Sequence, residues 1–200
     1  MPSSRYRFED FTTAQLDLRT YLPVNRSSTI NLRGLLAGTI DETVLPPQFQ
    51  LAFGGVGTLP GFSLFEGACG ARDQLVHMVT EDTILSDEPM LPAYGCDRVA
   101  LGQIEYRGGF GFGEPDDDED EDDIWWDVDD LDLTADWSFF VDVARGWSYG
   151  NMPFADRGDT ETMADVGIGV LFDQAGVYAA LPITGDDRSL RVVVRLKRRF

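Results

Sequence analysis

The sequence predicts an all-β fold, an antiparallel transmembrane β-barrel with about eight strands in this chain. Three observations predict it. No helical periodicity persists for the length of a helix, whereas glycine is frequent and aromatic residues make up 12% of the chain. The candidate strands alternate apolar with polar side chains, as strands do when their two faces meet different surroundings. The polar sides of these strands carry many charges, which suits a wet lumen better than a dry core.

The N-terminal part of the chain holds three expected strands. In the first, Leu16 and Leu18 alternate with Asp17 and Arg19, and the second repeats this pattern. The third places aromatic and aliphatic residues on one face. Two consecutive prolines before it exclude a strand or helix interior there. The three strands span about 13–21, 29–39 and 48–53, with turns over 22–26 and 41–47.

Five more strands are expected up to the C-terminus, with a tight hairpin at Asp173–Gly176. The last strand, SLRVVVRLKRRF, alternates most clearly and ends in an aromatic residue that fits the girdle of a membrane barrel. A soluble edge strand, blunted by its cations, is the alternative interpretation of this stretch. These strands span about 99–107, 137–144, 164–172, 176–183 and 189–200. The apolar face of the last strand consists of Leu190, Val192, Val194, Leu196 and Phe200.

Charges on the polar faces favour a barrel over a soluble core. Burying so many would cost several kcal/mol each unless they were paired. In a wet lumen they stay solvated, and opposite signs can pair across it. The residues concerned are Asp17, Arg19, Arg33, Glu105, Arg107, Asp142, Asp165, Arg191 and Arg195.

Two irregular segments interrupt the strands: a long loop over 54–97 and an acidic insert over 114–130. If the C-terminus lies on the inner side of the membrane, the insert and the 173–176 hairpin also lie there, and the long loop lies outside. The run at 116–123 could hold Ca²⁺. It lacks the spacing of an EF-hand loop, so a solvated charge run is favoured and no metal is assigned.

Composition restricts the partners and the compartment. The net charge of -19 argues against nucleic acid and against an anionic membrane surface. No apolar run is long enough for a transmembrane helix, and the first residues lack the apolar core of a signal peptide. An outer-membrane protein of this sequence would therefore be the C-terminal piece of a longer chain, or would start elsewhere. Cys69 and Cys96 could form a disulfide in an oxidising compartment, or could be two free thiols.

Several short motifs together resemble the bacterial surface antigen family, the barrel of outer-membrane assembly factors of the BamA and TamA type. The first is GGVGTLPGF at 54–62, followed by IEYR at 104–107, FVDVA at 140–144, DVGIG at 165–169 and the terminal aromatic residue. The resemblance covers about 5–200, and implies one domain over 1–200. The residues of the loop motif are Gly54, Gly55, Leu59, Pro60, Gly61 and Phe62.

The resemblance implies that the chain is the second half of a sixteen-stranded barrel whose outer loop folds back into the lumen. The family has an arginine where this chain has Pro60, and that arginine would pair with lumen acids that match Glu105 and Asp142. Arg72, Arg191 or Arg195 could pair with these acids instead. Alternatively, the two acids are ordinary solvated charges of the lumen.

The function implied by the resemblance is insertion or translocation of proteins at the bacterial cell outer membrane. No catalytic motif is present, so no enzyme activity and no cofactor are expected. The expected partners are outer-membrane lipid, unfolded outer-membrane or secreted client proteins, and periplasmic domains of the same longer protein, but not nucleic acid. A client strand would pair with the edge of the last strand. The residues of that seam strand and C-terminal signal are Val192, Val194, Leu196 and Phe200.

Two other functions fit the sequence. The chain could be a passive outer-membrane anchor or pore for an N-terminal domain, for example a patatin-like hydrolase. It could also be a soluble acidic β-sandwich that binds protein partners.

Overall fold

A computed structural model describes residues 10–70, 94–109, 135–150, 157–172 and 175–196. They form one seven-stranded antiparallel sheet and a single turn of 3₁₀ helix, Pro47–Phe49. None of the described residues forms a helix long and apolar enough to cross a membrane. The strands are β1 (Thr13–Asn25), β2 (Ser28–Thr39), β3 (Arg98–Gly109), β4 (Ala135–Trp147), β5 (Met163–Phe172), β6 (Ala175–Pro182) and β7 (Arg191–Arg195).

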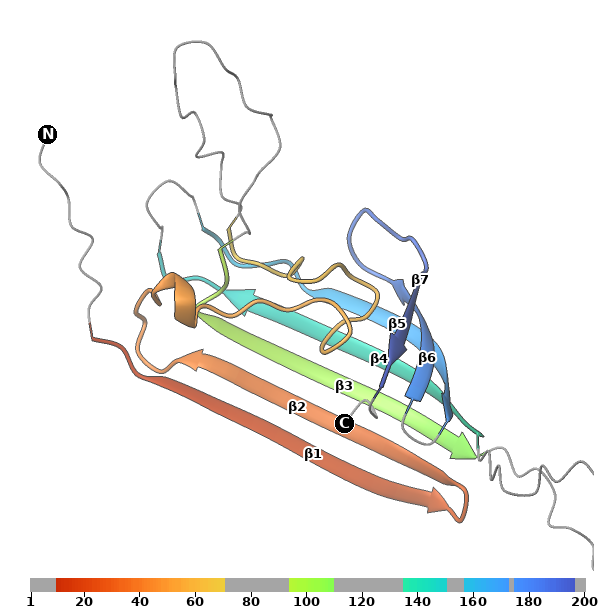
Figure 1. Cartoon of the computed structure of the whole chain (residues 1–200). Coiled ribbons are helices and arrows are strands. Elements are labelled where there is room, and N and C mark those ends of the chain that lie inside the picture. The colour runs from red at the N-terminus through yellow and green to blue at the C-terminus, as the bar shows by residue number, and fades with distance from the viewer. Residues whose placement is uncertain (1–9, 71–93, 110–134, 151–156, 173–174, 197–200) are drawn as a thin grey trace, which may run out of the picture.

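Each strand pairs with the next one in the sequence, so the sheet is an up-and-down meander with β1 and β7 at its edges. The sheet is strongly curved, and β6 and β7 turn away from the plane of β1 to β4 (Figure 1). The sequence prediction of an antiparallel all-β fold is confirmed. The described residues do not close into a barrel, because β1 and β7 are not paired with each other.

The expected strand at 48–53 is wrong, so the sheet has seven strands and not eight. Pro47 opens the 3₁₀ turn, where the missing N–H of proline is tolerated. Leu51 and Phe53 make only isolated bridges, to Cys96 and Gly67 respectively. The apolar residues of this stretch pack into a loop that crosses the sheet, and they do not extend the sheet.

The expected turn at 22–26 is also shorter than predicted. β1 continues through Pro23 to Asn25, with a register irregularity between these two residues. β1 is an edge strand, and a proline there removes no hydrogen bond from the interior of the sheet. The Asn25 side chain accepts a hydrogen bond of 2.9 Å from the Ser27 backbone N–H, which closes the turn.

The connections divide between the two ends of the sheet, and the long loop, the acidic insert and the 173–176 hairpin leave from the ends that were predicted for them. The turn over 26–27, the connection over 173–174 and the connection over 110–134 leave from one end. The connections over 40–97, 148–162 and 183–190 leave from the other end. The acidic insert itself lies outside the described residues, as do Arg72, His77 and Phe200.

Candidate functional site

The two faces of the sheet differ in chemistry and in what lies against them. We call the face crossed by the loop the covered face. One of its cross-strand rows is Arg19, Arg33, Gln103, Asp142, Asp165 and Pro182. We call the opposite side the bare face. One of its rows crosses all seven strands as Leu22, Ile30, Tyr106, Phe139, Ile168, Ala179 and Val192.

Residues 53–67, which we call the covering loop, cross the covered face, and the two ends of this loop lie together. Phe53 and Gly67 exchange two backbone hydrogen bonds, of 3.1 and 2.9 Å, and so join the two ends of the loop. Gly54 and Gly55 follow with φ values of 110° and 81°, a region that glycine adopts without steric cost. Thr58 then accepts a hydrogen bond of 2.8 Å from the Gly54 N–H through its hydroxyl oxygen. These contacts give the loop a fixed shape.

Polar side chains of β3, β5 and β7 hold the covering loop against the covered face. The Gly61 backbone N–H donates a hydrogen bond of 2.6 Å to Asp165 Oδ2 on β5. The Gln103 side chain on β3 donates to the Thr58 carbonyl at 2.7 Å. At the β7 edge, Arg195 Nη1 donates to the Val56 carbonyl at 3.3 Å and Arg191 lies 3.9 Å from Glu66. The loop therefore ties the middle of the sheet to its C-terminal edge.

Apolar side chains of the covering loop also pack against the covered face. Leu59 is fully buried and Phe62 almost so, against the covered face. Because backbone and side chains of the loop approach the sheet so closely, Gly61 has no room for a larger residue. A Cβ there would lie 2.8 Å from the Cβ of Asp165 and 3.0 Å from the backbone N of Pro182. The buried apolar cluster consists of Phe53, Leu59, Phe62, Cys69, Cys96, Val99, Leu101 and Ala144.

Three buried acids lie on the covered face, and the covering loop contacts one of them, Asp165. Glu105, Asp142 and Asp165 are all fully buried, so the expectation of solvated lumen charges is not met. Glu105 pairs with Arg107, two residues along the same strand, at 2.9 Å. The sequence proposed Arg72, Arg191 or Arg195 for that role and missed Arg107, although the i, i+2 spacing places it on the same face.

Sequence reasoning also missed Asp165 as the contact of the loop. It placed Asp165 on the polar side of its strand and assigned the lumen pair to Glu105 and Asp142. In the structure Asp142 and Asp165 are direct cross-strand partners, whereas Glu105 faces Phe140 in the next register position. The register of the strands, which no local pattern specifies, decides which acid meets the loop.

A second set of contacts holds the segment around Cys69, which follows the covering loop and which we call its root. Cys69 and Cys96 form a disulfide, with a Cα–Cα distance of 4.8 Å, which settles the alternative that the sequence left open. Gly146 on β4 lies directly beneath it, and a Cβ there would overlap the Cys96 sulfur. The Gly158 N–H donates a hydrogen bond of 2.8 Å to the Cys69 carbonyl, and so adds the β4–β5 connection to this root.

An ion pair lies beside the disulfide. Asp97 and Arg157 are both fully buried at their side chains, with Arg157 Nη1 3.1 Å from Asp97 Oδ2. Asp97 also accepts hydrogen bonds from the backbone N–H groups of Leu45 and Tyr149, each of 2.8 Å. Arg157 in turn donates to the Gly95 carbonyl at 2.6 Å. The pair thus joins two connections, 40–97 and 148–162, at one end of the sheet.

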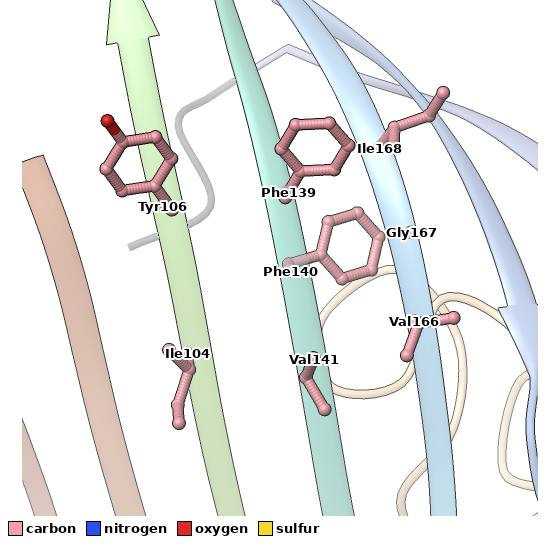
Figure 2. Close-up of a pocket in the computed structure, with 8 residues that line it drawn as sticks. All are labelled: Ile104, Tyr106, Phe139, Phe140, Val141, Val166, Gly167 and Ile168. Carbon is pink, nitrogen blue, oxygen red and sulfur yellow. The ribbon is translucent and has the colours of Figure 1, made fainter. Parts of the chain in front are cut away.

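The bare face is apolar, and no described residue covers it. Phe139 and Ile168 are more than half exposed, as are Ile104 and the edge residues Val192 and Val194. Figure 2 shows a shallow hollow on β3, β4 and β5, lined by Ile104, Tyr106, Phe139, Phe140, Val141, Val166, Gly167 and Ile168. Exposed apolar patches of this extent usually mark contact with a partner or with lipid.

Aromatic rings cluster at one end of the bare face. Trp137 lies 5.3 Å from the Tyr106 ring and 5.4 Å from the Phe139 ring, measured between centroids. These residues lie at the end of the sheet where the 173–174 connection leaves. Rings in such a position are typical of the interface between hydrocarbon and water.

The loop connecting β6 and β7 holds one perturbed acid. A hydrogen bond from the Ser189 side chain, helped by the Ser189 backbone N–H, lowers the pKa of Asp187.

Among the described residues, no group of three or more histidine, cysteine or acidic side chains could hold a metal ion. No family model and no curated protein matches the chain.

The sequence-predicted site residues fall into two groups. The loop motif and the acids Glu105 and Asp142 lie on the covered face, where the Gly61 N–H of the motif bonds a third acid, Asp165. The seam residues Val192 and Val194 instead lie on the bare face of the edge strand β7. Leu196 follows β7 and is exposed, and the C-terminal aromatic lies outside the described residues.

Proposed function

We propose that this chain is part of an outer-membrane β-barrel, with its bare face toward lipid and its covered face toward the lumen. The observation that carries the proposal is the distribution of side chains between the two faces. In a soluble sheet the apolar face would be buried and the charged face solvated. Here no described residue covers the apolar row through Tyr106, Phe139 and Ile168, and the acids on the opposite face are buried. Lipid is the environment in which that arrangement is stable.

We further propose that the barrel inserts or translocates proteins at the outer membrane, as its resemblance to assembly factors implies. The support from the structure is the C-terminal edge. Among the described residues β7 pairs on one side only, with β6, so its other side offers backbone groups to a client strand. Val192 and Val194 present apolar side chains beside that edge.

Two measurements test the proposal in sequence. The first is partition of the purified chain between buffer and phosphatidylcholine vesicles, with protease protection as the readout of insertion. The second is photo-cross-linking from Val192 to an unfolded outer-membrane protein during its folding into the same vesicles. Val141 is the matched control, since it is also a valine on the bare face but lies on the interior strand β4.

The expected result is insertion, with client adducts from the Val192 position and none above background from Val141. A chain that remains in buffer would overturn the membrane proposal and favour a soluble partner-binding protein. Insertion with equal adducts from both positions would overturn the client-strand mechanism.

A passive anchor or pore is the second candidate function. The observation that favours it is the number of contacts that hold the covering loop, from Asp165, Gln103 and Arg195 to the disulfide at its root. A loop held by this many contacts suits a fixed plug better than a moving part. Insertion without client adducts at Val192 would select this candidate.

A further inference from the structure

The arginines on the two faces of the sheet have different partners. On the covered face, Arg107 forms an ion pair with the buried Glu105. On the bare face, Arg98 and Arg145 make no ion pair with any carboxylate of the described residues. The whole chain has 35 acidic residues and only 16 basic ones, so acids are not scarce. Neither cation has a carboxylate partner in the part of the chain that the structure describes, so both are able to bind an anion.

Arg98 is held in place from two sides. Its Nε donates a hydrogen bond to the Thr39 carbonyl and its Nη2 to the Ile40 carbonyl, each of 2.6 Å. The guanidinium lies 4.9 Å from the centre of the Tyr149 ring. The remaining amino group, Nη1, makes no hydrogen bond to the described residues. The side chain is therefore oriented in advance, with donors left for a ligand.

Arg145 lies beside it on the neighbouring strand. Its register partner is Ala100, two residues beyond Arg98 on the same face, and its guanidinium lies 5.8 Å from the centre of the Trp147 ring. A hollow with an apolar floor extends from this rim over β1 and β2. Its lining on the bare face includes Leu16, Leu36, Ile40, Arg98 and Trp147.

The position along β4 places this rim near the border between hydrocarbon and lipid headgroups. Arg145 and Trp137 are both on the bare face and eight residues apart, which is about 26 Å along the strand at ~3.3 Å per residue. At a strand tilt of about 35–45° this length spans about 19–22 Å of the membrane normal, and the apolar band of a membrane barrel is about 25 Å tall. Between them, the bare face of β4 carries only Val143, Val141 and Phe139. Trp137 and Arg145 therefore lie near the two borders of the band.

We propose that Arg98, Arg145 and Trp147 form a binding site for the phosphate of an anionic membrane lipid, with an acyl chain in the adjoining hollow. Guanidinium N–H groups donate strong hydrogen bonds to phosphate oxygens, and Arg98 and Arg145 are diagonal cross-strand neighbours on the bare face, with Arg98 Nη1 left to donate. A lipid fits better than a free phosphate because the hollow below the arginines is lined by Leu16, Leu36 and Ile40. This inference rests on the proposed membrane location and adds a ligand to it.

The test compares lipid binding by the full chain and by the double variant R98Q/R145Q. Both are inserted into neutral phosphatidylcholine vesicles, extracted in a neutral detergent and titrated with phosphatidic acid or phosphatidylcholine, with bound lipids counted by native mass spectrometry. We expect wild type to prefer phosphatidic acid. Each arginine removed should cost about a fivefold loss of that preference, since a basic residue near an anionic leaflet contributes about 1 kcal/mol.

The matched control is R188Q, which removes the same charge from the exposed loop at the same end of the sheet. It should retain the full preference. Equal preference in wild type and R98Q/R145Q would overturn the lipid site, although insertion into neutral vesicles would leave the barrel proposal standing. Loss of the preference on adding inorganic phosphate, with no bound lipid remaining, would overturn it in favour of a free anion site. Failure of wild type to insert would overturn both proposals.

Discussion

The backbone N–H of Gly61 donates a hydrogen bond of 2.6 Å to Asp165 Oδ2, so the loop makes this contact through its main chain. This contact joins residues 104 positions apart and lies between a tight loop and a fully buried carboxylate. The donor follows Pro60 directly, so the main chain of the loop reaches an acid of the covered face.

Gly61→Ala should loosen the covering loop, because the new Cβ would lie 2.8 Å from the Cβ of Asp165. Overpacking of this kind typically costs about 1–3 kcal/mol. The expected result is a lower thermal midpoint in detergent and faster protease cleavage within 53–67. The control is Gly57→Ala, where a Cβ would meet nothing within 4 Å. If the two variants are cleaved equally fast, the close approach at Gly61 does not hold the loop.

Asp165→Asn and Asp165→Ala should differ. The asparagine keeps an oxygen that can accept from the Gly61 N–H, whereas alanine leaves a buried donor without its partner, at a cost of about 1–3 kcal/mol. We expect the alanine variant to unfold at the lower temperature and its loop to be cleaved faster. Equal behaviour of the two variants would show that the hydrogen bond contributes nothing measurable to the seating of the loop.

Reduction of the Cys69–Cys96 disulfide should destabilise the fold. The bond spans 27 positions, and the loop-entropy model gives about 3–4 kcal/mol for a closed loop of that length. The measurement is the unfolding midpoint with and without a reductant. The C69S/C96S variant is the control, because its lower midpoint should not respond to reductant at all. If reductant also lowers the unfolding midpoint of that variant, the loss of stability does not come from breaking this disulfide.

Arg157→Met should leave the fully buried Asp97 without its cation. Removing one partner of a buried ion pair typically costs about 3–5 kcal/mol. The expected result is a large drop in denaturant midpoint, whereas Arg26→Met in the exposed β1–β2 turn should change stability by less than about 0.5 kcal/mol. A small effect at Arg157 would mean that water or backbone groups satisfy Asp97 when the cation is gone.

Val141→Lys distinguishes a lipid-facing sheet from a soluble one. Val141 lies in the middle of the bare face, where a lysine in a membrane barrel costs about 2–4 kcal/mol. We expect insertion into vesicles to fall sharply. Leu64→Lys is the control, since Leu64 is also an exposed apolar residue but belongs to the covering loop. Unchanged insertion with Val141→Lys, or improved solubility without loss of any function, would contradict the assignment of this face to lipid.

Part of the fold follows from local pattern alone. The alternation along 13–21, 99–107 and 189–196 predicts which side chains share a face, and the register confirms that Asp17, Glu105 and Arg195 all lie on the covered side. The ends of the sheet from which the long connections leave were also predictable. Both are consequences of the two-residue period of a strand and of the order of strands in a meander.

The error at 48–53 has a physical cause. Phe49, Leu51 and Phe53 alternate as a strand would, but alternation over so few residues does not distinguish a sheet strand from a loop that packs against a sheet. Instead of joining the sheet, Leu51 and Phe53 form isolated bridges to Cys96 and Gly67, and these bridges make the base of the covering loop.

The sequence by itself determined the all-β class and the separation of a charged face from an apolar one, because these depend only on neighbouring residues along each strand. Only the tertiary structure decided that Cys69 bonds to Cys96, that Asp165 and not Glu105 meets Gly61, and that the strands number seven. These features depend on strand register and on the path of a long loop. Both are set by the packing of residues far apart in the chain, which no local period encodes.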